Sequence, residues 1–125
     1  MSARERADKD SERFDEWIRH ANESGEEPAI PAATVVVLRD TDEGLQTLML
    51  KKNSKIAFGG MWVFPGGKID ANDYDETGDL VAAARRAAVR ETHEEAQLDV
   101  DAESLVMIAH WIPPSIAPKR FATWF

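Results

Sequence analysis

Arg90-Glu91-Thr92-His93-Glu94-Glu95 is the stretch of this sequence that decides its fold and its chemistry. Its glutamates are spaced i, i+3 and i+4, which places three carboxylates on one face of a helix. Like charges at this spacing destabilise a helix by about 0.2–0.5 kcal/mol per pair. The pattern therefore predicts either a counter-charge close to this face or an acidic face in contact with solvent.

The helix that carries these glutamates is predicted from about Leu80 to Gln97, with Asp79 as its N-cap. At about 100° per residue, the three glutamates fall within its apolar stripe. The small and apolar members of that stripe are Leu80, Ala84, Ala87, Ala88 and Leu98. The other side, expected to be ordinary solvated surface, carries Arg85, Arg86, Arg90, His93 and Gln97. Carboxylates within an inward-facing stripe indicate the lining of a cavity.

Carboxylates that gather in a partly desolvated place need counter-charge, and hard divalent cations prefer oxygen ligands. Mg²⁺ usually shares its coordination shell between water, one or two carboxylates and phosphate oxygens of a substrate. The cluster of Glu91, Glu94 and Glu95 therefore predicts Mg²⁺ or Mn²⁺ as the cofactor, and not zinc. Arg90 is expected to hold one of these carboxylates through a charge-assisted hydrogen bond.

Two consecutive glycines follow the predicted strand at residues 61–64, in the segment Phe64-Pro65-Gly66-Gly67-Lys68-Ile69-Asp70. A tight turn with positive φ needs only one glycine. Two glycines also let backbone amides and carbonyls approach an ion or a phosphate closely. The glycine pair is therefore a candidate second wall of a site whose first wall is the glutamate helix.

The remaining pattern is that of strands around one helix. Apolar and β-branched runs predict strands at residues 34–38, 46–50, 61–64, 105–112 and 119–125, with a hairpin turn at residues 40–44. This order indicates an α+β domain over residues 32–125. Residues 1–31 form a charged N-terminal arm, expected to be either a short amphipathic helix through Phe14, Trp17 and Ile18 or a solvated segment.

The composition narrows the function classes. The chain has 125 residues, a net charge of −8 and no cysteine. An acidic surface disfavours polymeric nucleic acid as a partner but not a phosphorylated metabolite bridged by a cation. The lack of cysteine excludes disulfides and thiolate nucleophiles. The sequence has no apolar run of signal-peptide or membrane-span length, so we expect a soluble cytoplasmic protein without a membrane partner.

Taken together, these residues resemble the Nudix box, Gly-x5-Glu-x7-Arg-Glu-U-x-Glu-Glu-x-Gly-U, in which U is bulky and apolar. Gly67 corresponds to the opening glycine, residues 90–98 match the second half, and residues 62–70 resemble the strand and turn that lead into the box. The resemblance covers roughly Ala32 to the chain end. It implies an α/β/α sandwich with a mixed sheet and a loop-helix-loop metal site.

The resemblance also implies an activity, the hydrolysis of a diphosphate linkage in a nucleoside diphosphate derivative with Mg²⁺ or Mn²⁺. By analogy, Glu94 and Glu95 bind the metal, and Glu91 is a further ligand or the base for the attacking water. The Gly66 carbonyl is another implied ligand, and Arg90 belongs to the catalytic set. The candidate substrate contacts are Gly67, Lys52 and Arg120.

The sequence departs from the box in three places. Between Gly67 and Arg90 lie 22 residues where the box has 13, so the first glutamate of the box has no fixed counterpart. Gln97 replaces the late glycine, at a helix end that favours the left-handed conformation. Thr92 occupies a position where the box has a bulky apolar residue. The candidates for the missing glutamate are Asp70, Asp73, Asp75 and Glu76.

The widened box resembles the Nudix branch that includes coenzyme A diphosphatases, so coenzyme A esters are the leading expected substrates. Residues 51–60 loosely resemble the upstream coenzyme A segment of that branch, with Lys52 and Lys55 where arginines are expected. Family members normally continue with further strands and a helix, so we expect a C-terminally incomplete domain. The alternatives are a non-catalytic nucleotide-binding sensor and an inactive fragment that pairs with another chain; a homodimer is one expected assembly.

Overall fold

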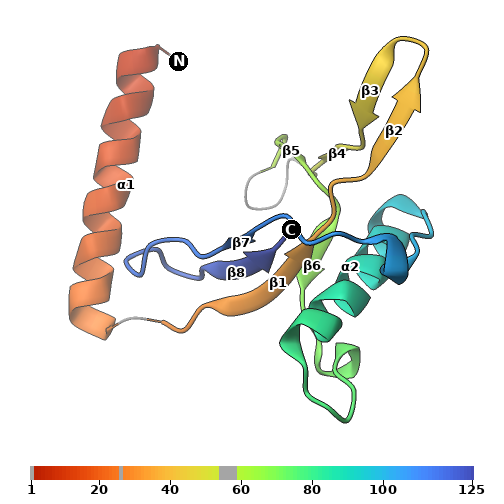
Figure 1. Cartoon of the computed structure of the whole chain (residues 1–125). Coiled ribbons are helices and arrows are strands. Elements are labelled where there is room, and N and C mark those ends of the chain that lie inside the picture. Colours follow the sequence, from red (N-terminus) through yellow and green to blue (C-terminus); the bar gives the residue numbers. More distant parts are fainter. Residues whose placement is uncertain (1, 26, 54–58) are drawn as a thin grey trace. The chain divides into compact units, whose positions relative to one another are not determined.

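The computed structural model describes residues 2–25, 27–53 and 59–125 (Figure 1). The chain divides into two compact units. One consists of Met1–Ile30 and Ile112–Ala122, and the other of Pro31–Trp111 and Thr123–Phe125. The glutamate helix and the glycine pair both belong to the second unit.

The first unit contains α1 (Ala3–Ser24), so the N-terminal arm is helical. Ser2 and Glu5 form a capping box: the Ser2 hydroxyl accepts from the Glu5 amide at 3.2 Å, and the Glu5 carboxylate accepts from the Ser2 amide at 2.6 Å. Within α1, none of the 22 residues is buried. Phe14 and Trp17 contact each other with ring centroids 5.5 Å apart. Neither α1 nor any other described helix has the length and apolar content needed to cross a membrane.

A four-stranded sheet supports the second unit, in the order β6 (Gly66–Lys68), β1 (Ile30–Thr34), β8 (Phe121–Trp124) and β7 (His110–Trp111). The β1–β6 and β7–β8 pairs are antiparallel, whereas the arrows of β1 and β8 point the same way (Figure 1). The sheet is therefore mixed, as predicted. Its register places Ala33 opposite Gly67 and Thr34 opposite Gly66.

Two smaller antiparallel pairs complete the strands. The pair β2 (Leu38–Thr41) and β3 (Gly44–Thr47) confirms the hairpin predicted around residues 40–44. Thr41 closes the turn, because its hydroxyl donates to the Gly44 carbonyl at 2.8 Å. The other pair is β4 (Leu50–Lys51) with β5 (Trp62–Val63).

Three predicted strands have the wrong bounds. Residues 46–50 are not one strand, because β3 ends at Thr47 and β4 begins at Leu50. Residues 34–38 are not one strand, because β1 ends at Thr34 and β2 begins at Leu38; between them the Val35 amide donates to the Pro65 carbonyl at 2.8 Å. Residues 105–112 contain only β7, at His110–Trp111. Next to it, the Ile108 amide donates to the Phe125 carbonyl at 2.8 Å. The apolar pattern of residues 105–107 is real, but a strand also needs a neighbour to pair with.

The predicted helix is confirmed as α2 (Leu80–Ala96), and the Asp79 carboxylate caps it by accepting from the amides of Val81 and Ala82. Short 3₁₀ turns precede and follow it, η1 (Ala71–Asp73) and η2 (Ala102–Ser104). Its buried face packs on the sheet with Val35 and Ile69 in a core built largely of small side chains. The buried residues of α2 are Ala83, Ala84, Ala87, Ala88 and Thr92.

Two parts of the predicted helical stripe are wrong. Its ends, Leu80 and Leu98, are exposed. The arginine side is also not ordinary solvated surface. Arg85 Nη1 donates to the carbonyls of Ala102 and Leu105, at 3.0 and 2.6 Å, and so fastens the segment after the helix.

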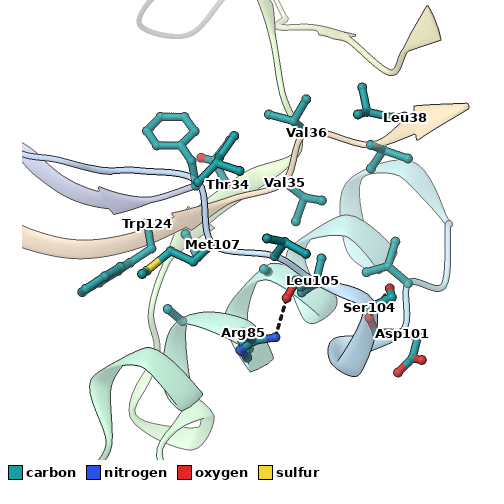
Figure 2. Close-up of a pocket in the computed structure, with 18 of the residues that line it drawn as sticks. Thr34, Val35, Val36, Leu38, Arg85, Asp101, Ser104, Leu105, Met107 and Trp124 are labelled. Atoms are coloured by element: carbon teal, nitrogen blue, oxygen red, sulfur yellow. Dashed lines mark hydrogen bonds between the residues drawn. The ribbon is translucent and has the colours of Figure 1, made fainter. Parts of the chain in front are cut away.

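Beside α2 the second unit has an apolar cavity of about 590 Å³ (Figure 2). Val35 from the end of β1, Ala84 of α2, and Leu105 and Met107 of the segment after η2 form its walls. Trp124 of β8 lies at one side, and its ring stacks on His110 with centroids 3.8 Å apart.

Gln97 ends α2 in the left-handed conformation, with φ 54° and ψ 32°, as predicted for the position where the box has glycine. In this conformation a residue with a side chain is about 1 kcal/mol less favourable than glycine in the folded state. Glycine also has more conformational freedom in the unfolded chain, which offsets part of that difference. We expect Gln97→Gly to raise the free energy of unfolding by about 0.5 kcal/mol in urea titrations. A decrease would show that the glutamine side chain stabilises the helix end.

Candidate metal and catalytic site

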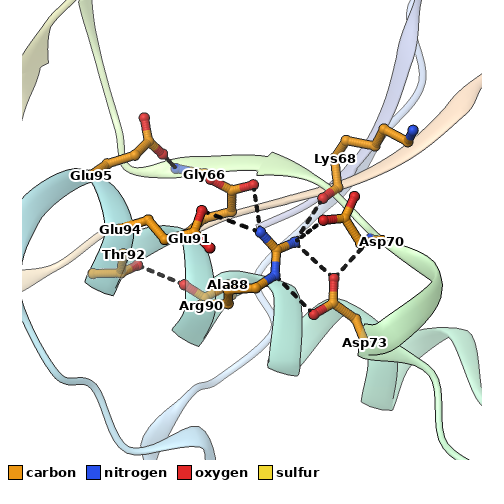
Figure 3. A network of polar contacts seen from close by, with 10 residues as sticks. All are labelled: Gly66, Lys68, Asp70, Asp73, Ala88, Arg90, Glu91, Thr92, Glu94 and Glu95. Carbon is orange, nitrogen blue, oxygen red and sulfur yellow. Dashed lines mark hydrogen bonds and ion pairs between the residues drawn. The ribbon is translucent and has the colours of Figure 1, made fainter.

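Gly66, the first residue of the glycine pair, lies against the glutamate helix (Figure 3). The Gly66 amide donates to Glu95 Oε1 at 2.9 Å. A Cβ at Gly67 would lie 2.5 Å from Glu91 Oε1, and one at Gly66 would collide with the backbone of β1 at Ala33. Only glycine fits at either position without displacing a neighbour. The predicted second wall and the glutamates are therefore adjacent, because strand β6 packs directly on α2.

Arg90 is the centre of the polar contacts around these glutamates (Figure 3). Its guanidinium forms a two-pronged pair with Asp73, with Nε–Oδ1 at 3.0 Å and Nη2–Oδ2 at 2.8 Å. Nη2 also donates to the Lys68 carbonyl at 3.1 Å and lies 3.5 Å from Asp70 Oδ2. Arg90 therefore fastens α2 to both β6 and η1.

The other terminal nitrogen of Arg90 faces the glutamates. Nη1 donates to Glu91 Oε1 at 3.0 Å and to Glu94 Oε2 at 3.4 Å. Hydrogen bonds to carboxylates, first to Asp73 and then to Glu91, raise the pKa of Arg90, so the guanidinium stays charged. The predicted hydrogen bond from Arg90 to a carboxylate is therefore present.

Asp73 is the acidic residue of the widened segment that Arg90 holds. Its side chain is 5% exposed, and its Oδ2 also accepts from the Asp70 amide at 2.7 Å. The hydrogen bond from Arg90 lowers the pKa of Asp73 despite the opposing effect of burial. Asp75 instead pairs with Arg86 at 2.7 Å, and Asp70 touches Arg90 only at longer range. Of the four candidates for the missing glutamate, Asp73 is thus the one that Arg90 joins by short hydrogen bonds to the cluster of Glu91 and Glu94.

The three glutamates have different surroundings. The Glu91 side chain is 17% exposed, and its pKa is raised, first by burial and then by the neighbouring charges of Glu95 and Glu94, against the hydrogen bond and charge of Arg90, which lower it. Glu94 and Glu95 are exposed. Glu91 is therefore a carboxyl that lacks full compensation for its charge, beside two carboxylates that remain open to solvent.

The oxygen donors around the glutamates are of the kind that a hard divalent cation binds. Carboxylate oxygens on α2 and a backbone carbonyl on β6 are the ligands that Mg²⁺ and Mn²⁺ prefer, and the uncompensated Glu91 gains from a cation nearby. Among the described residues, no group of three or more His, Cys, Asp or Glu side chains is arranged so that it could hold a metal ion. The residues therefore fit an ion that takes much of its shell from water and substrate phosphate, with Glu91, Glu94, Glu95 and the Gly66 carbonyl available to hold it.

Two of the predicted substrate contacts have structural partners of their own. Arg120 belongs to the first unit, where its guanidinium donates to the carbonyls of Pro113, at 3.2 Å, and Glu27, at 3.4 Å. Lys52 follows β4, and its backbone pairs with Met61 and Gly60. The resemblance at residues 51–60 depends partly on residues 54–58, Lys55 among them, which lie outside the described part of the chain.

Thr92 shows how the structure accommodates a departure from the box. The side chain is fully buried, and its hydroxyl donates to the Ala88 carbonyl at 2.7 Å. A buried hydroxyl with a hydrogen-bond partner costs little. A threonine therefore serves at a position where the box has a bulky apolar residue.

Comparison with known proteins identifies the family of this chain. The model of the NUDIX domain family matches residues 28–125. The chain belongs to this family. Three solved chains match, one of them the crystal structure of a MutT/nudix family protein from Enterococcus faecalis, with a TM-score of 0.61 and 18% identity. The match covers 78% of this chain and 36% of that one. Among curated proteins, the comparison finds no match.

The family and this likeness establish the predicted α+β Nudix fold. The chain spans about a third of the length of the solved relative, 36%. The substrate of the whole protein therefore does not follow from this likeness.

The Arg90–Asp73 pair makes a prediction about stability. The pKa of Asp73 is lower in the folded state than its ordinary 3.8, so the pair stabilises the fold above about pH 4, and that stabilisation is lost as the pH falls through the folded pKa. Asp73→Asn should lower the free energy of unfolding at pH 7 by about 1–3 kcal/mol, because it weakens hydrogen bonds to a charged group. Urea titrations from pH 2 to 7 should show a smaller loss in the acid range for this variant.

Asp75→Asn is the matched control, since Asp75 pairs with Arg86 at a more exposed position, with a side chain that is 48% exposed. Exposed pairs contribute about 0–1 kcal/mol. Equal effects of the two substitutions would contradict the role assigned to Asp73.

Proposed function

We propose that the chain carries the metal-binding and catalytic centre of a hydrolase that cleaves a diphosphate linkage with Mg²⁺ or Mn²⁺. The observation that carries this proposal is the meeting of Gly66 and Gly67 with Glu95 and Glu91. The glycine backbone, which has no side chain to block an approach, and the cluster of carboxylates are then adjacent. This arrangement suits a cation and a phosphate bound together.

Each residue has a proposed role. Glu94 and Glu95 hold the cation together with the Gly66 carbonyl, and Glu91 is a further ligand or the base that takes a proton from the attacking water. The raised pKa of Glu91 supports the second of its roles, because a base accepts a proton more readily as its pKa approaches that of the medium. A bound divalent cation would neutralise charge on the diphosphate and lower the pKa of a bound water.

Arg90 is a positioning residue in this proposal. Asp73 holds one edge of its guanidinium, and Glu91 and Glu94 accept from its other terminal nitrogen. A planar group fixed at one edge restricts the carboxylates at the other. Gly67 leaves room for Glu91, and Lys52 remains a candidate contact for the substrate.

Glu95→Gln tests the proposed metal site. The amide keeps an oxygen that can accept from Gly66, so the fold should persist while the ligand charge is lost. Loss of a metal ligand should lower Mg²⁺-dependent diphosphate hydrolysis roughly a hundredfold or more. Glu103→Gln, in the exposed turn η2, is the control of equal charge and should leave the rate unchanged. Equal rates for the two variants would contradict the proposal.

Gly67→Ala tests the positioning of Glu91. The added Cβ would lie 2.5 Å from Glu91 Oε1, so the carboxylate must move although no charge is removed. A displacement of this kind should lower kcat roughly tenfold to a hundredfold and leave the far-ultraviolet circular dichroism unchanged. Wild-type kcat would show that Glu91 need not occupy the position seen here.

The substrate class within this activity is proposed from the resemblance alone, and coenzyme A esters come first. Hydrolysis of coenzyme A esters, dinucleotides and nucleotide sugars should be compared at equal concentration with Mg²⁺ and with Mn²⁺. Tight nucleotide binding without turnover of any of them would favour a sensor instead of an enzyme.

A further inference from the structure

Lys51 and Trp62 are cross-strand neighbours in the antiparallel pair of β4 and β5, and together they are called here the tryptophan platform. The Lys51 Nζ lies 5.9 Å from the centroid of the Trp62 ring, within the range of a cation–π contact. The strand pair continues beyond them, because the Lys52 amide donates to the Met61 carbonyl at 2.9 Å. Neighbours therefore hold both the backbone of Trp62 and its ring.

The tryptophan platform lies on the outer side of this strand pair. Leu50 and Val63, which form the other cross-strand pair, are partly buried. Alternate residues of a strand point to opposite faces, so Trp62 takes the face opposite to Val63. Trp62 is 61% exposed, whereas most tryptophans bury the greater part of their surface. The platform thus offers a flat apolar ring to a ligand.

The segment that carries the tryptophan platform is basic, although the whole chain has a net charge of −8. Residues 44–69 contain no aspartate or glutamate, and their charged residues are Lys51, Lys52, Lys55 and Lys68. Positive charge in an otherwise acidic chain attracts an anionic ligand to this segment. An aromatic ring beside cations suits a nucleotide, because its base stacks on the ring and its phosphates are attracted by the cations.

A short length of chain joins the tryptophan platform to the candidate site. Trp62 precedes Gly66 by four residues, and β5 runs into β6 through Phe64 and Pro65 (Figure 1). Four residues of chain span at most about 14 Å. This is comparable with the length of an extended nucleoside diphosphate. A ligand whose diphosphate lies at the glycine pair therefore has its base within reach of Trp62.

We propose that Trp62 stacks on the aromatic base of the substrate and so determines that the substrate is a nucleotide. Lys51 is a positioning residue, because its ammonium group contacts the ring. The assignment rests on the proposed hydrolysis of a nucleoside diphosphate derivative. Every base has a flat π face, so the platform selects for the presence of a base more than for its identity.

Binding of AMP and of ribose 5-phosphate to the full chain in Mg²⁺ tests the platform, because the two ligands differ only in the base. In equilibrium dialysis, Trp62→Leu should raise the dissociation constant of AMP roughly tenfold or more and leave that of ribose 5-phosphate unchanged. Trp62→Phe keeps a ring for stacking and should retain most of the affinity. Trp111→Leu, which removes a tryptophan that is 72% exposed, is the matched control and should bind AMP as the wild type does.

Hydrolysis of ADP-glucose gives a second measurement. Trp62→Leu should raise KM and leave kcat unchanged, because the base stacks equally in the ground state and the transition state. AMP has no diphosphate linkage, so its binding tests the platform even if the wild type hydrolyses nothing, a result that would contradict the proposed function alone. Equal wild-type affinity for the two ligands, unchanged AMP binding in Trp62→Leu, or equal weakening of both ligands in that variant would overturn the role of Trp62.

Discussion

The close approach between α2 and strands β1 and β6 sets the position of the groups in the candidate site. It depends on small residues on both sides of the contact, since Ala83 and Ala87 are fully buried and glycine occupies the facing positions of β6. A larger side chain at Ala83 or Ala87 would push the helix outward, and one at Gly67 would displace the Glu91 carboxylate. Glu91 would then lose its place beside Gly67, and Glu95 its hydrogen bond from Gly66.

This tight contact brings several acidic groups together, and the positive charge of Arg90 offsets the repulsion between them. The guanidinium is shared between Asp73, which is buried, and the glutamates, which are more open to solvent. The buried acid is fully paired, whereas Glu91 retains a raised pKa. The protein thus neutralises the acid that holds the structure together and leaves charge at the place where a cation is proposed to bind.

The two ends of α2 have different neighbours. Near its C-terminus the helix presents carboxylates to the glycine pair, and along its earlier turns it lines an apolar cavity closed on one side by residues 105–108. Arg85 and Arg90 fasten these two regions to the helix by hydrogen bonds to backbone carbonyls. The candidate site and the apolar cavity therefore share one helix without sharing residues.

The sequence by itself determined α2, its cap at Asp79, the hairpin at residues 40–44 and the left-handed end at Gln97, because each of these depends on local spacing and backbone preference. Its resemblance to a known motif also predicted that the glycine pair lies close to the glutamates. Only the tertiary structure decided that Asp73, among four acids, pairs with Arg90, and that Arg85 is tied to the backbone. It also showed that residues 105–107 have no partner strand in the described chain. Those outcomes depend on which segments meet in space, and neither periodicity nor composition records such contacts.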